Sequence, residues 1–387
     1  MREIGVDPRG VAIMADKFEH YQVRIFDLTF RQAAIIKQEM LARGAEAAVP
    51  WQVCSWEKEE TGYTYQAFLS GTRRQLDQFI AKLKQQPFGL EKIAAKLETA
   101  LNNYSGAATD FKLLIQGKTY DLKARAHIMG IINLTPDSFS YDGLYGQAGY
   151  IDLALKQAEE MVAAGADFLD LGGESTRPGA EKVSADEEAK RLLPVLKELT
   201  RAVSVPISVD TYKPAVAEAA LEMGAVMIND IWGLRSPDDP EGRMAQVAAS
   251  AKCPVILMHN REEPEYRFLM KEIIESLEKS IEIALAHGVD FEQIIIDPGI
   301  GFGKTYHHNL QTLQNLDQLR VLGRPILLGT SRKSVIGLTL DLPVEERLEG
   351  TIAANLWGVA KGANVLRVHD VKAATRAVRM YEAIANA

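Results

Sequence analysis

The chain has 387 residues, enough for one large domain with a smaller one, or for two ordinary domains. Hydrophobic residues make up 47% and charged residues 25%, the balance of a soluble globular protein. The formal net charge of −8 argues against a broad surface for nucleic acid or an anionic membrane. A local basic pocket for a phosphorylated substrate stays open.

Cys54 and Cys253 are the only cysteines, too few for a disulfide framework or a CxxC metal site. The N-terminal segment MREIGVDPRG is charged and lacks the apolar core of a secretion signal. No stretch reaches the about 18 apolar residues that span a membrane. We therefore expect a cytoplasmic protein.

The first 107 residues predict a small α+β domain. Its expected elements are a helix over 31–43, strands over 45–49 and 63–70, a helix that Thr72 caps and that runs to about Lys84, and a helix after Gly89. No chemically reactive group of residues stands out there, so the role of this domain stays open. The small, polar segment 104–110 suits a linker, which gives domains of 1–107 and 108–387.

The second domain begins with residues 111–122, which predict a hairpin that turns at Gln116-Gly117. Beyond it, one order repeats four times: a helix, a glycine, and an apolar strand that ends in polar residues. The repeats cover 163–173, 222–230, 286–299 and 361–370. The glycine suits the positive φ that follows a helix, and the apolar run suits a strand covered on both faces. Strands that alternate with helices in this way predict a parallel sheet.

Eight such apolar runs predict a (β/α)₈ TIM barrel, an α/β fold, behind the small α+β domain. The runs are 128–133, 168–173, 206–210, 227–231, 254–259, 294–299, 325–330 and 365–370. Eight strands over roughly 260 residues match the size of a TIM barrel; an open doubly wound sheet is the alternative. Seven of the eight runs end in, or lead directly into, polar residues. TIM-barrel enzymes place their catalytic residues at these carboxyl ends.

Seven motifs at the strand ends carry a resemblance to a known family. They are IMGIINLTPDSFS (128–140), GGESTRPGA (172–180), SVDTYKP (208–214), INDIWG (228–233), DPGIGFGKT (297–305), GTSRKSVIG (329–337) and RVHDV (367–371). In this order they resemble the dihydropteroate synthases, from about residue 111 to near the C-terminus. The resemblance implies a transferase of folate biosynthesis. Such an enzyme condenses (7,8-dihydropterin-6-yl)methyl diphosphate with 4-aminobenzoate, gives 7,8-dihydropteroate and releases pyrophosphate with the help of Mg²⁺.

The pterin site that the resemblance implies also makes chemical sense. A pterin has a guanidine-like edge, and a carboxylate matches it with two hydrogen bonds. Asp297 is the candidate for that role, with Asp210 and Asn229 completing the polar rim. Lys333 would reach the carbonyl side of the ring, and Met258 would pack under it. The alternative for each Asp or Asn is a helix N-cap.

The diphosphate site is expected where the last strand closes against the first. Arg367 and His369 are two residues apart on a strand and so share a face. TIM barrels often bind phosphate near the loops after strands seven and eight. Asn133 ends the first strand, and the resemblance implies that it also helps to hold Mg²⁺. The alternative for Arg367 is a surface ion pair.

The loops after the first two strands are expected to cover the second substrate. The resemblance implies that Thr176, Arg177 and Pro178 flank 4-aminobenzoate and that Phe302 provides an apolar wall. Ser334 could meet the carboxylate through backbone N–H groups near the start of a helix. The first loop departs from the family, because SFSYDGLYG (138–146) stands where typical members run more directly into Asp-Gly-Gly. That departure concerns loop closure.

No side chain is placed as a nucleophile, so positioning and charge stabilisation are expected to supply catalysis. The catalytic candidates are Asp210, Asp297, Lys333 and Asp137. Asp137 would steady charge or the incoming amine. Its alternative is a turn-forming residue after Pro136.

Two other functions remain open on the sequence. A methyltetrahydrofolate:corrinoid methyltransferase shares the pterin-binding barrel but needs neither a diphosphate site nor a cover for 4-aminobenzoate. A non-catalytic pterin-binding scaffold would use the N-terminal domain to recruit a partner. The expected partners are the two small-molecule substrates, with no nucleic acid and no membrane. A homodimer is suggested by analogy with the family alone.

Overall fold

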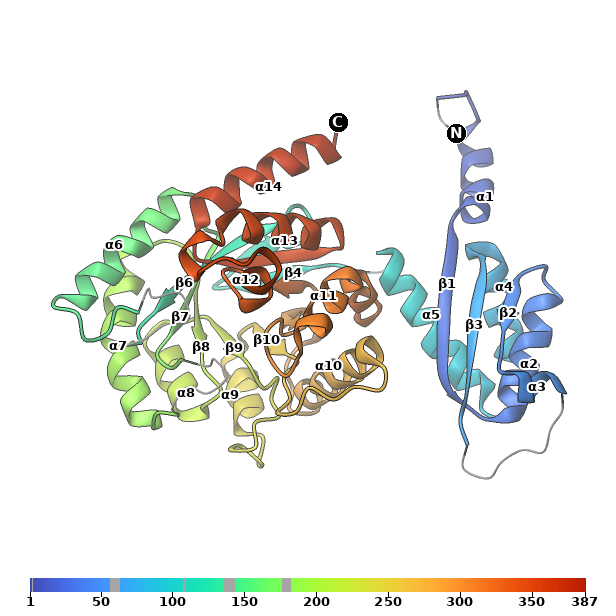
Figure 1. Ribbon diagram of the computed structural model, residues 1–387, viewed down its shortest axis with the longest axis horizontal. Helices are drawn as coiled ribbons and strands as arrows, with labels where there is room; N and C mark the ends of the chain where they lie inside the picture. Colours follow the sequence, from blue (N-terminus) through green and yellow to red (C-terminus); the bar gives the residue numbers. More distant parts are fainter. Residues whose placement is uncertain (2, 56–62, 107–108, 136–142, 176–181) are drawn as a thin grey trace. The chain divides into compact units, whose positions relative to one another are not determined.

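The computed structural model describes residues 1, 3–55, 63–106, 109–135, 143–175 and 182–387. Contacts within the chain divide it into two compact units, Met1–Ser105 and Gly106–Ala387. Figure 1 shows the elements of both units, and each unit has a hydrophobic core of its own. None of the helices in the described ranges is long and apolar enough to cross a membrane.

The first unit is a three-stranded antiparallel sheet with helices, in strand order β1-β3-β2. Its strands are β1 (His20–Leu28), β2 (Glu46–Ala48) and β3 (Tyr65–Thr72), and its helices are α1 (Pro8–Phe18), α2 (Phe30–Leu41), α3 (Trp51–Ser55), α4 (Arg73–Leu83) and α5 (Leu90–Ser105). The predicted cap is present, because the Thr72 side chain accepts a hydrogen bond from the backbone N–H of Gln75. Three elements, α1, β1 and α3, were not among those predicted. As an edge strand, β1 buries few side chains fully, so its apolar alternation is weak.

The second unit is a closed barrel of eight parallel strands, which confirms the predicted TIM-barrel fold. The strands are β6 (His127–Asn133), β7 (Phe168–Gly172), β8 (Ile207–Asp210), β9 (Met227–Asp230), β10 (Val255–Met258), β11 (Ile294–Asp297), β12 (Ile326–Leu328) and β13 (Ala363–Val368). Their order around the barrel follows the chain, and β13 pairs with β6 to close it.

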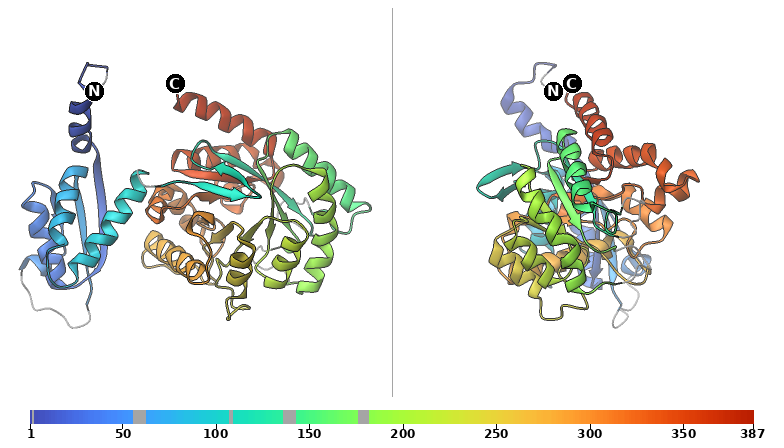
Figure 2. Two further views of the ribbon diagram at one scale, coloured as in Figure 1. Left: turned by 180° about the vertical axis from the view of Figure 1, so that it is seen from behind. Right: turned by 90° about the vertical axis from the view of Figure 1, so that its left-hand side faces the viewer.

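Helices lie outside these strands (Figure 2). They are α6 (Tyr150–Ala163), α7 (Ala185–Ala202), α8 (Pro214–Glu222), α9 (Arg243–Ala251), α10 (Leu269–Ala286), α11 (Tyr306–Gln314), α12 (Ser334–Leu340), α13 (Leu348–Ala360) and α14 (Val371–Ala385). The glycines that start the four repeats, Gly165, Gly224, Gly288 and Gly362, have φ of +102°, +111°, +92° and +100°. Each therefore ends a helix in the backbone conformation that the repeat predicts.

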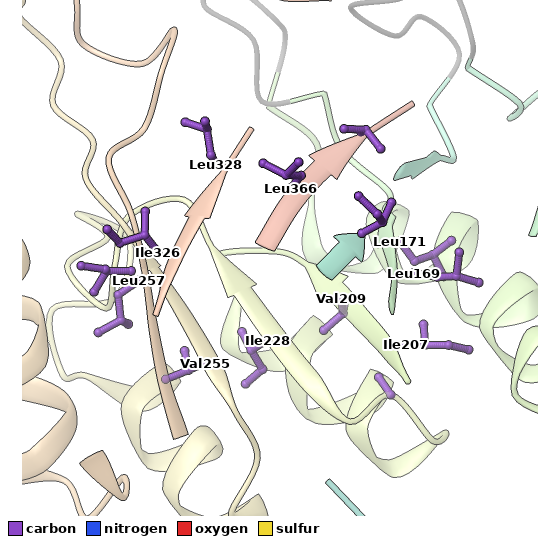
Figure 3. Close-up of a cluster of buried hydrophobic side chains, with 14 of the residues drawn as sticks. Leu169, Leu171, Ile207, Val209, Ile228, Val255, Leu257, Ile326, Leu328 and Leu366 are labelled. Atoms are coloured by element: carbon purple, nitrogen blue, oxygen red, sulfur yellow. The ribbon is translucent and has the colours of Figure 1, made fainter. Parts of the chain in front are cut away.

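Side chains alternate along each strand between two apolar layers. One set, which includes Leu169, Val209 and Leu257, packs with the helices, and Figure 3 shows it. Burying a side chain of this size stabilises the fold by roughly 1.5–3 kcal/mol. The alternate set points into the barrel and forms a separate cluster at the amino-terminal end of the strands, which we call the lower cluster.

The hairpin β4 (Lys112–Ile115) and β5 (Lys118–Asp121) completes this lower cluster. It turns at Gln116-Gly117, as predicted, with φ of +49° and +78°. The cluster contains Leu113, Ile115 and Leu122 of the hairpin region together with Met129, Phe168, Met227, Ile256, Ile295, Leu327 and Val365 of the strands. The hairpin region thus covers the amino-terminal end of the strands with apolar side chains.

Candidate active site at the carboxyl ends of the strands

Polar side chains occupy the barrel interior directly above the lower cluster. Residues two apart on a strand point to the same side. Phe168, Ile295 and Val365 belong to the lower cluster, so the residues two positions later also point inward. We call the set the upper layer; its members are Asn133, Asp170, Asp210, Asn229, Met258, Asp297 and Arg367.

The guanidinium group of Arg367 connects two carboxylates of the upper layer. Arg367 Nε donates to Asp170 Oδ2 and Arg367 Nη2 donates to Asp210 Oδ2, each at 2.6 Å. Asn229 Nδ2 donates to the same Asp170 oxygen at 2.9 Å. The side chains of Asp170, Asp210 and Arg367 are 0%, 10% and 19% exposed, so the surface ion pair considered for Arg367 is wrong and the pair is internal. Burial alone would lower the pKa of Arg367, but the neighbouring carboxylates outweigh it and raise that pKa, so the guanidinium stays charged.

Burial leaves these carboxylates with unmet hydrogen-bonding capacity. The Oδ1 atoms of Asp170 and Asp210 are buried and have no hydrogen-bond partner among the described residues. Desolvation raises the pKa of Asp210 to about 7; Arg367 opposes the rise, and Asp170 adds to it. An acceptor in this condition is suited to an N–H donor from a ligand.

Asp297 and Lys333 are two further charged residues of the site, and each influences the pKa of the other. Asp297 is 5% exposed, and its Oδ1 accepts a hydrogen bond from Gly299 N at 2.7 Å. The helix N-cap considered for Asp297 is wrong, because the next helix, α11, begins at Tyr306 and has Thr305 as its N-cap. Burial raises the pKa of Asp297, and Lys333 opposes the rise. Burial lowers the pKa of Lys333 to about 8, and Asp297 opposes that change. Lys333 Nζ donates to the carbonyl of Ile300 and lies 4.8 Å from the centre of the Phe302 ring.

Of the expected phosphate-binding residues, Asn133 and Arg367 belong to the upper layer, and His369 follows β13. A Cβ built on Gly172 would lie 3.9 Å from Asn133 Oδ1 and 3.8 Å from Asp210 Oδ2, so both side chains border the same small space. His369 Nδ1 lies 2.9 Å from Ser331 Oγ, which also accepts a hydrogen bond from the backbone N–H of His369. Ser331 therefore fixes the orientation of the imidazole ring.

The residues expected around 4-aminobenzoate are only partly described. Phe302 and Lys333 are neighbours, and Ser334 is the exposed first residue of α12. The other expected residues, Asp137, Thr176, Arg177 and Pro178, lie outside the described residues.

The sequence analysis missed Asp170, which belongs to the centre of the network. Asp170 lies inside an apolar strand, two residues before the strand ends, so a search of strand ends passes over it. Its signal was present, because a carboxylate within a buried strand requires a partner.

A second missed group surrounds Lys213. Lys213 Nζ contacts carboxylate oxygens of Glu174 and Glu188; its distance to Glu188 Oε2 is 2.6 Å. The side chains of Glu174 and Glu188 are 5% and 1% exposed. Glu174 follows β7, Glu188 belongs to α7 and Lys213 lies in the loop after β8, so the three residues join elements that frame the upper layer.

Comparisons with known proteins agree with this site. Residues 129–369 match the pterin binding enzyme family. The chain is 51% identical over 271 residues to the dihydropteroate synthase of Clostridium beijerinckii, which covers 70% of this chain and 98% of that protein. It also resembles a crystal structure of the dihydropteroate synthase of Clostridium difficile obtained in the presence of pteroic acid. That match has 47% identity and a TM-score of 0.65, and covers 68% of this chain and 98% of the other.

A further relative matches nearly the whole chain. It is a probable bifunctional folylpolyglutamate synthase/dihydropteroate synthase of Halobacterium salinarum, 37% identical over 385 residues, or 98% of this chain and 44% of that protein. The N-terminal unit therefore has a counterpart there. Among the functions left open by the sequence, the relatives favour the synthase over the methyltransferase, since the pterin binding family match fits both. The chain belongs to the dihydropteroate synthases within the pterin-binding enzyme family.

Proposed function

We propose that the upper layer of this synthase binds (7,8-dihydropterin-6-yl)methyl diphosphate and that the chain joins it to 4-aminobenzoate with release of pyrophosphate. The observation that carries this proposal is the gathering of carboxylates and cations at one end of the barrel: Asp170 and Asp210 pair with Arg367, and the charge of Lys333 acts on Asp297. Pteroic acid, present with the Clostridium difficile relative, contains both a pterin and a 4-aminobenzoate group.

The pterin ring would lie among the residues of β8 to β11. Asp297 would accept hydrogen bonds from the ring N–H and the exocyclic amine, and Asp210 offers the second acceptor. Asn229 and Lys333 would contact the polar edge of the ring, and the buried Met258 would pack under its face. Because Asp210, Asn229 and Asp297 are buried, an analogue that cannot pair with them leaves them unpaired and binds poorly.

The diphosphate would lie toward β13 and β6, where Arg367, His369 and Asn133 supply cations and an amide. No group of three His, Cys, Asp or Glu residues in the described part of the chain could hold a metal ion. A Mg²⁺ ion bound to a diphosphate typically takes only one or two protein oxygens. Asn133 Oδ1, close to the Asp210 carboxylate, fits that requirement. Bound there, Mg²⁺ would neutralise charge on the departing pyrophosphate.

The reaction would proceed by early rupture of the bond to the leaving group. The C–O bond breaks and its electron pair leaves with pyrophosphate, while the pterin ring stabilises the resulting cation. The nitrogen lone pair of 4-aminobenzoate forms the C–N bond, and that nitrogen then loses a proton. Arg367 and His369 steady the leaving group, and Asp210 and Asp297 steady the electron-poor ring. Lys333 holds the carbonyl side of the pterin.

The second substrate would lie over the pterin, against Phe302 and near the start of α12 at Ser334. Roles for Thr176, Arg177, Pro178 and Asp137 in covering it and steadying its amine stay part of the proposal. The possible dimer is likewise a proposal.

The test follows pyrophosphate and dihydropteroate together, with purified full-length chain, both substrates and Mg²⁺. We expect both products in equal amounts. Asp297→Ala removes the acceptor for the pterin edge and should lower kcat/KM by about a hundredfold, because one such partner contributes about 3 kcal/mol. Asp317→Ala, which removes an ion pair with Lys361 and changes none of the proposed site residues, is the control and should act like the parent chain. Unchanged pterin affinity in Asp297→Ala would exclude this role for Asp297.

A further inference from the structure

Lys304, in the loop after β11, uses all of its hydrogen-bonding capacity inside the protein. Its Nζ donates to His259 Nδ1 at 2.8 Å, to the carbonyl of Gly299 at 3.0 Å and to the carbonyl of Phe302 at 3.2 Å. An ammonium group has three hydrogens, so these three acceptors saturate it. Lys304 therefore has no donor left for a ligand.

His259 is well suited to accept the hydrogen bond from Lys304. Burial lowers the pKa of His259 to about 2, and the charges of Lys304 and Arg235 add to that effect. The imidazole is therefore neutral, and Nδ1 can act as an acceptor while the proton lies on Nε2. His259, just after the end of β10, therefore has a structural hydrogen bond.

The loop between β11 and Lys304 is pressed closely against the segment after β10. Gly299 and Gly303 have φ of +68° and +53°, which glycine adopts without strain. A Cβ on Gly299 would lie 2.0 Å from the carbonyl oxygen of His259, and one on Gly303 would lie 2.3 Å from that of Arg261. Tyr266 Oη adds a hydrogen bond of 2.7 Å to the carbonyl of Gly303. The backbone path of this loop therefore leaves no room for a side chain at either glycine.

This loop presents the groups that surround Lys333 and Asp297. The carbonyl of Ile300 accepts from Lys333 Nζ, and the Phe302 ring lies beside that ammonium group. The N–H of Gly299 donates to Asp297 Oδ1. Two of the three acceptors on Lys304, the carbonyls of Gly299 and Phe302, belong to residues on either side of Ile300. Lys304 thus ties together the two ends of the segment that orients Lys333.

We propose that Lys304 is a positioning residue for pterin binding, which acts through the loop 299–302 on Lys333 and Asp297. The inference rests on the proposed function, since it assigns to this loop the placing of the groups that contact the pterin. Lys304 does not touch the substrate. Its loss lets Ile300 and Phe302 move, and Lys333 then loses its acceptor and its aromatic neighbour.

The test compares Lys304→Met, which keeps the length of the side chain and removes its donors, with Lys361→Met, a lysine with an ion pair elsewhere in the barrel. Binding of 6-hydroxymethyl-7,8-dihydropterin, which lacks the diphosphate, is measured by calorimetry, and kcat and KM are measured for both substrates. We expect Lys304→Met to weaken pterin binding and to lower kcat/KM by about tenfold to a hundredfold, since small displacements of reacting groups have effects of this size. Lys361→Met should match the parent chain.

A second variant keeps the test valid if Lys304→Met is poorly folded. His259→Phe removes one of the three acceptors, so it should shift pterin affinity in the same direction by a smaller factor. The double variant should be no worse than Lys304→Met alone, because the contact that His259→Phe removes is already lost in Lys304→Met. Parent-like pterin affinity in a folded Lys304→Met protein would overturn the inference, and so would a loss seen only with the diphosphate-bearing substrate. An inactive parent chain would instead count against the proposed function.

Discussion

Arg367 contacts two carboxylates at once, so each carboxylate matters for stability as well as for chemistry. Asp170 supplies the deeper contact and is fully buried, and it also accepts from Asn229. Removing one partner of a buried ion pair leaves an uncompensated charge behind. The site residues of this barrel are therefore part of its core, in the same way as the apolar layers around them.

Replacing Asp170 should destabilise the barrel more than replacing a partly exposed carboxylate. We expect Asp170→Ala to lower the free energy of unfolding by about 3–5 kcal/mol, because Arg367 loses its deeper partner. Asp317→Ala, which removes a partly exposed ion pair with Lys361, should cost less than about 1 kcal/mol. Urea unfolding of the two variants measures the difference. Equal losses would show that the internal network contributes no more than a surface pair.

The pH dependence of kcat/KM should have an acidic limb that belongs to Asp210. Its pKa is raised to about 7, so it takes up a proton as the pH falls below that value and stops balancing Arg367. On the alkaline side, Lys333 with a pKa of about 8 and Lys304 with a pKa of about 7 lose their protons as the pH rises. Both limbs should therefore lie near neutrality. Initial rates across this range test the shape, and an Asp210→Asn variant should lose the acidic limb at a lower overall rate.

The sequence indicated the candidate site residues that are charged and stand where an apolar strand ends. Asp297, Lys333 and Arg367 lie at or just after the ends of apolar strands, and this position is what predicted a site. Asp170 was missed because it lies inside a strand, where pattern alone gives it no role. The contacts of Lys304 could not be predicted, because its three acceptors come from two loops whose meeting depends on the packing of β10 against β11.

Among the elements, the glycines after helices link each helix to the strand that follows. The four repeats share this glycine and, in the structure, its positive φ. The repeat indicated alternating helices and strands, and the eight apolar runs gave the number of strands. The first unit lacked such a repeat. Its edge strand β1 buries few side chains, so its pattern gave no clear strand signal.

Two of these glycines allow a matched comparison. Gly288→Ala meets no atom within 4 Å of the new Cβ, so it should cost about 1–2 kcal/mol from left-handed backbone strain alone. In Gly224→Ala the Cβ would lie 2.9 Å from Thr200 Cγ2, so Thr200 must leave its rotamer, at about 1 kcal/mol more. Thermal unfolding measures both variants. In a Thr200→Ala background the two glycine substitutions should become equal, and a persistent gap would point to another cause.

At the scale of the whole molecule, the two units have separate cores. The core of the first unit contains residues from Leu28 to Leu101 and that of the barrel contains residues from Ala126 to Val378. The Clostridium beijerinckii relative matches this chain over 271 residues, which are 98% of the relative's length. That relative is therefore about the size of the barrel and leaves little room for a counterpart of the first unit. The extra unit of this chain is shared with the Halobacterium salinarum relative.

The barrel should therefore fold and work without the first unit. We expect a protein of residues 106–387 to keep kcat/KM within about twofold of the full chain, because domains with their own cores fold alone. Calorimetry of the full chain should show two transitions, of which the truncated protein keeps one. A truncated protein that is unfolded or inactive would show that the barrel depends on the first unit.

The hairpin β4–β5 closes the barrel at the amino-terminal end of its strands. Because Leu113, Ile115 and Leu122 join the apolar cluster at the foot of the strands, a molecule resting on Asp210 and Asp297 has that cluster beneath it. Substrates and products then have to enter and leave the barrel at its carboxyl-terminal end. We therefore expect the molecule that binds deepest to bind first and to dissociate last.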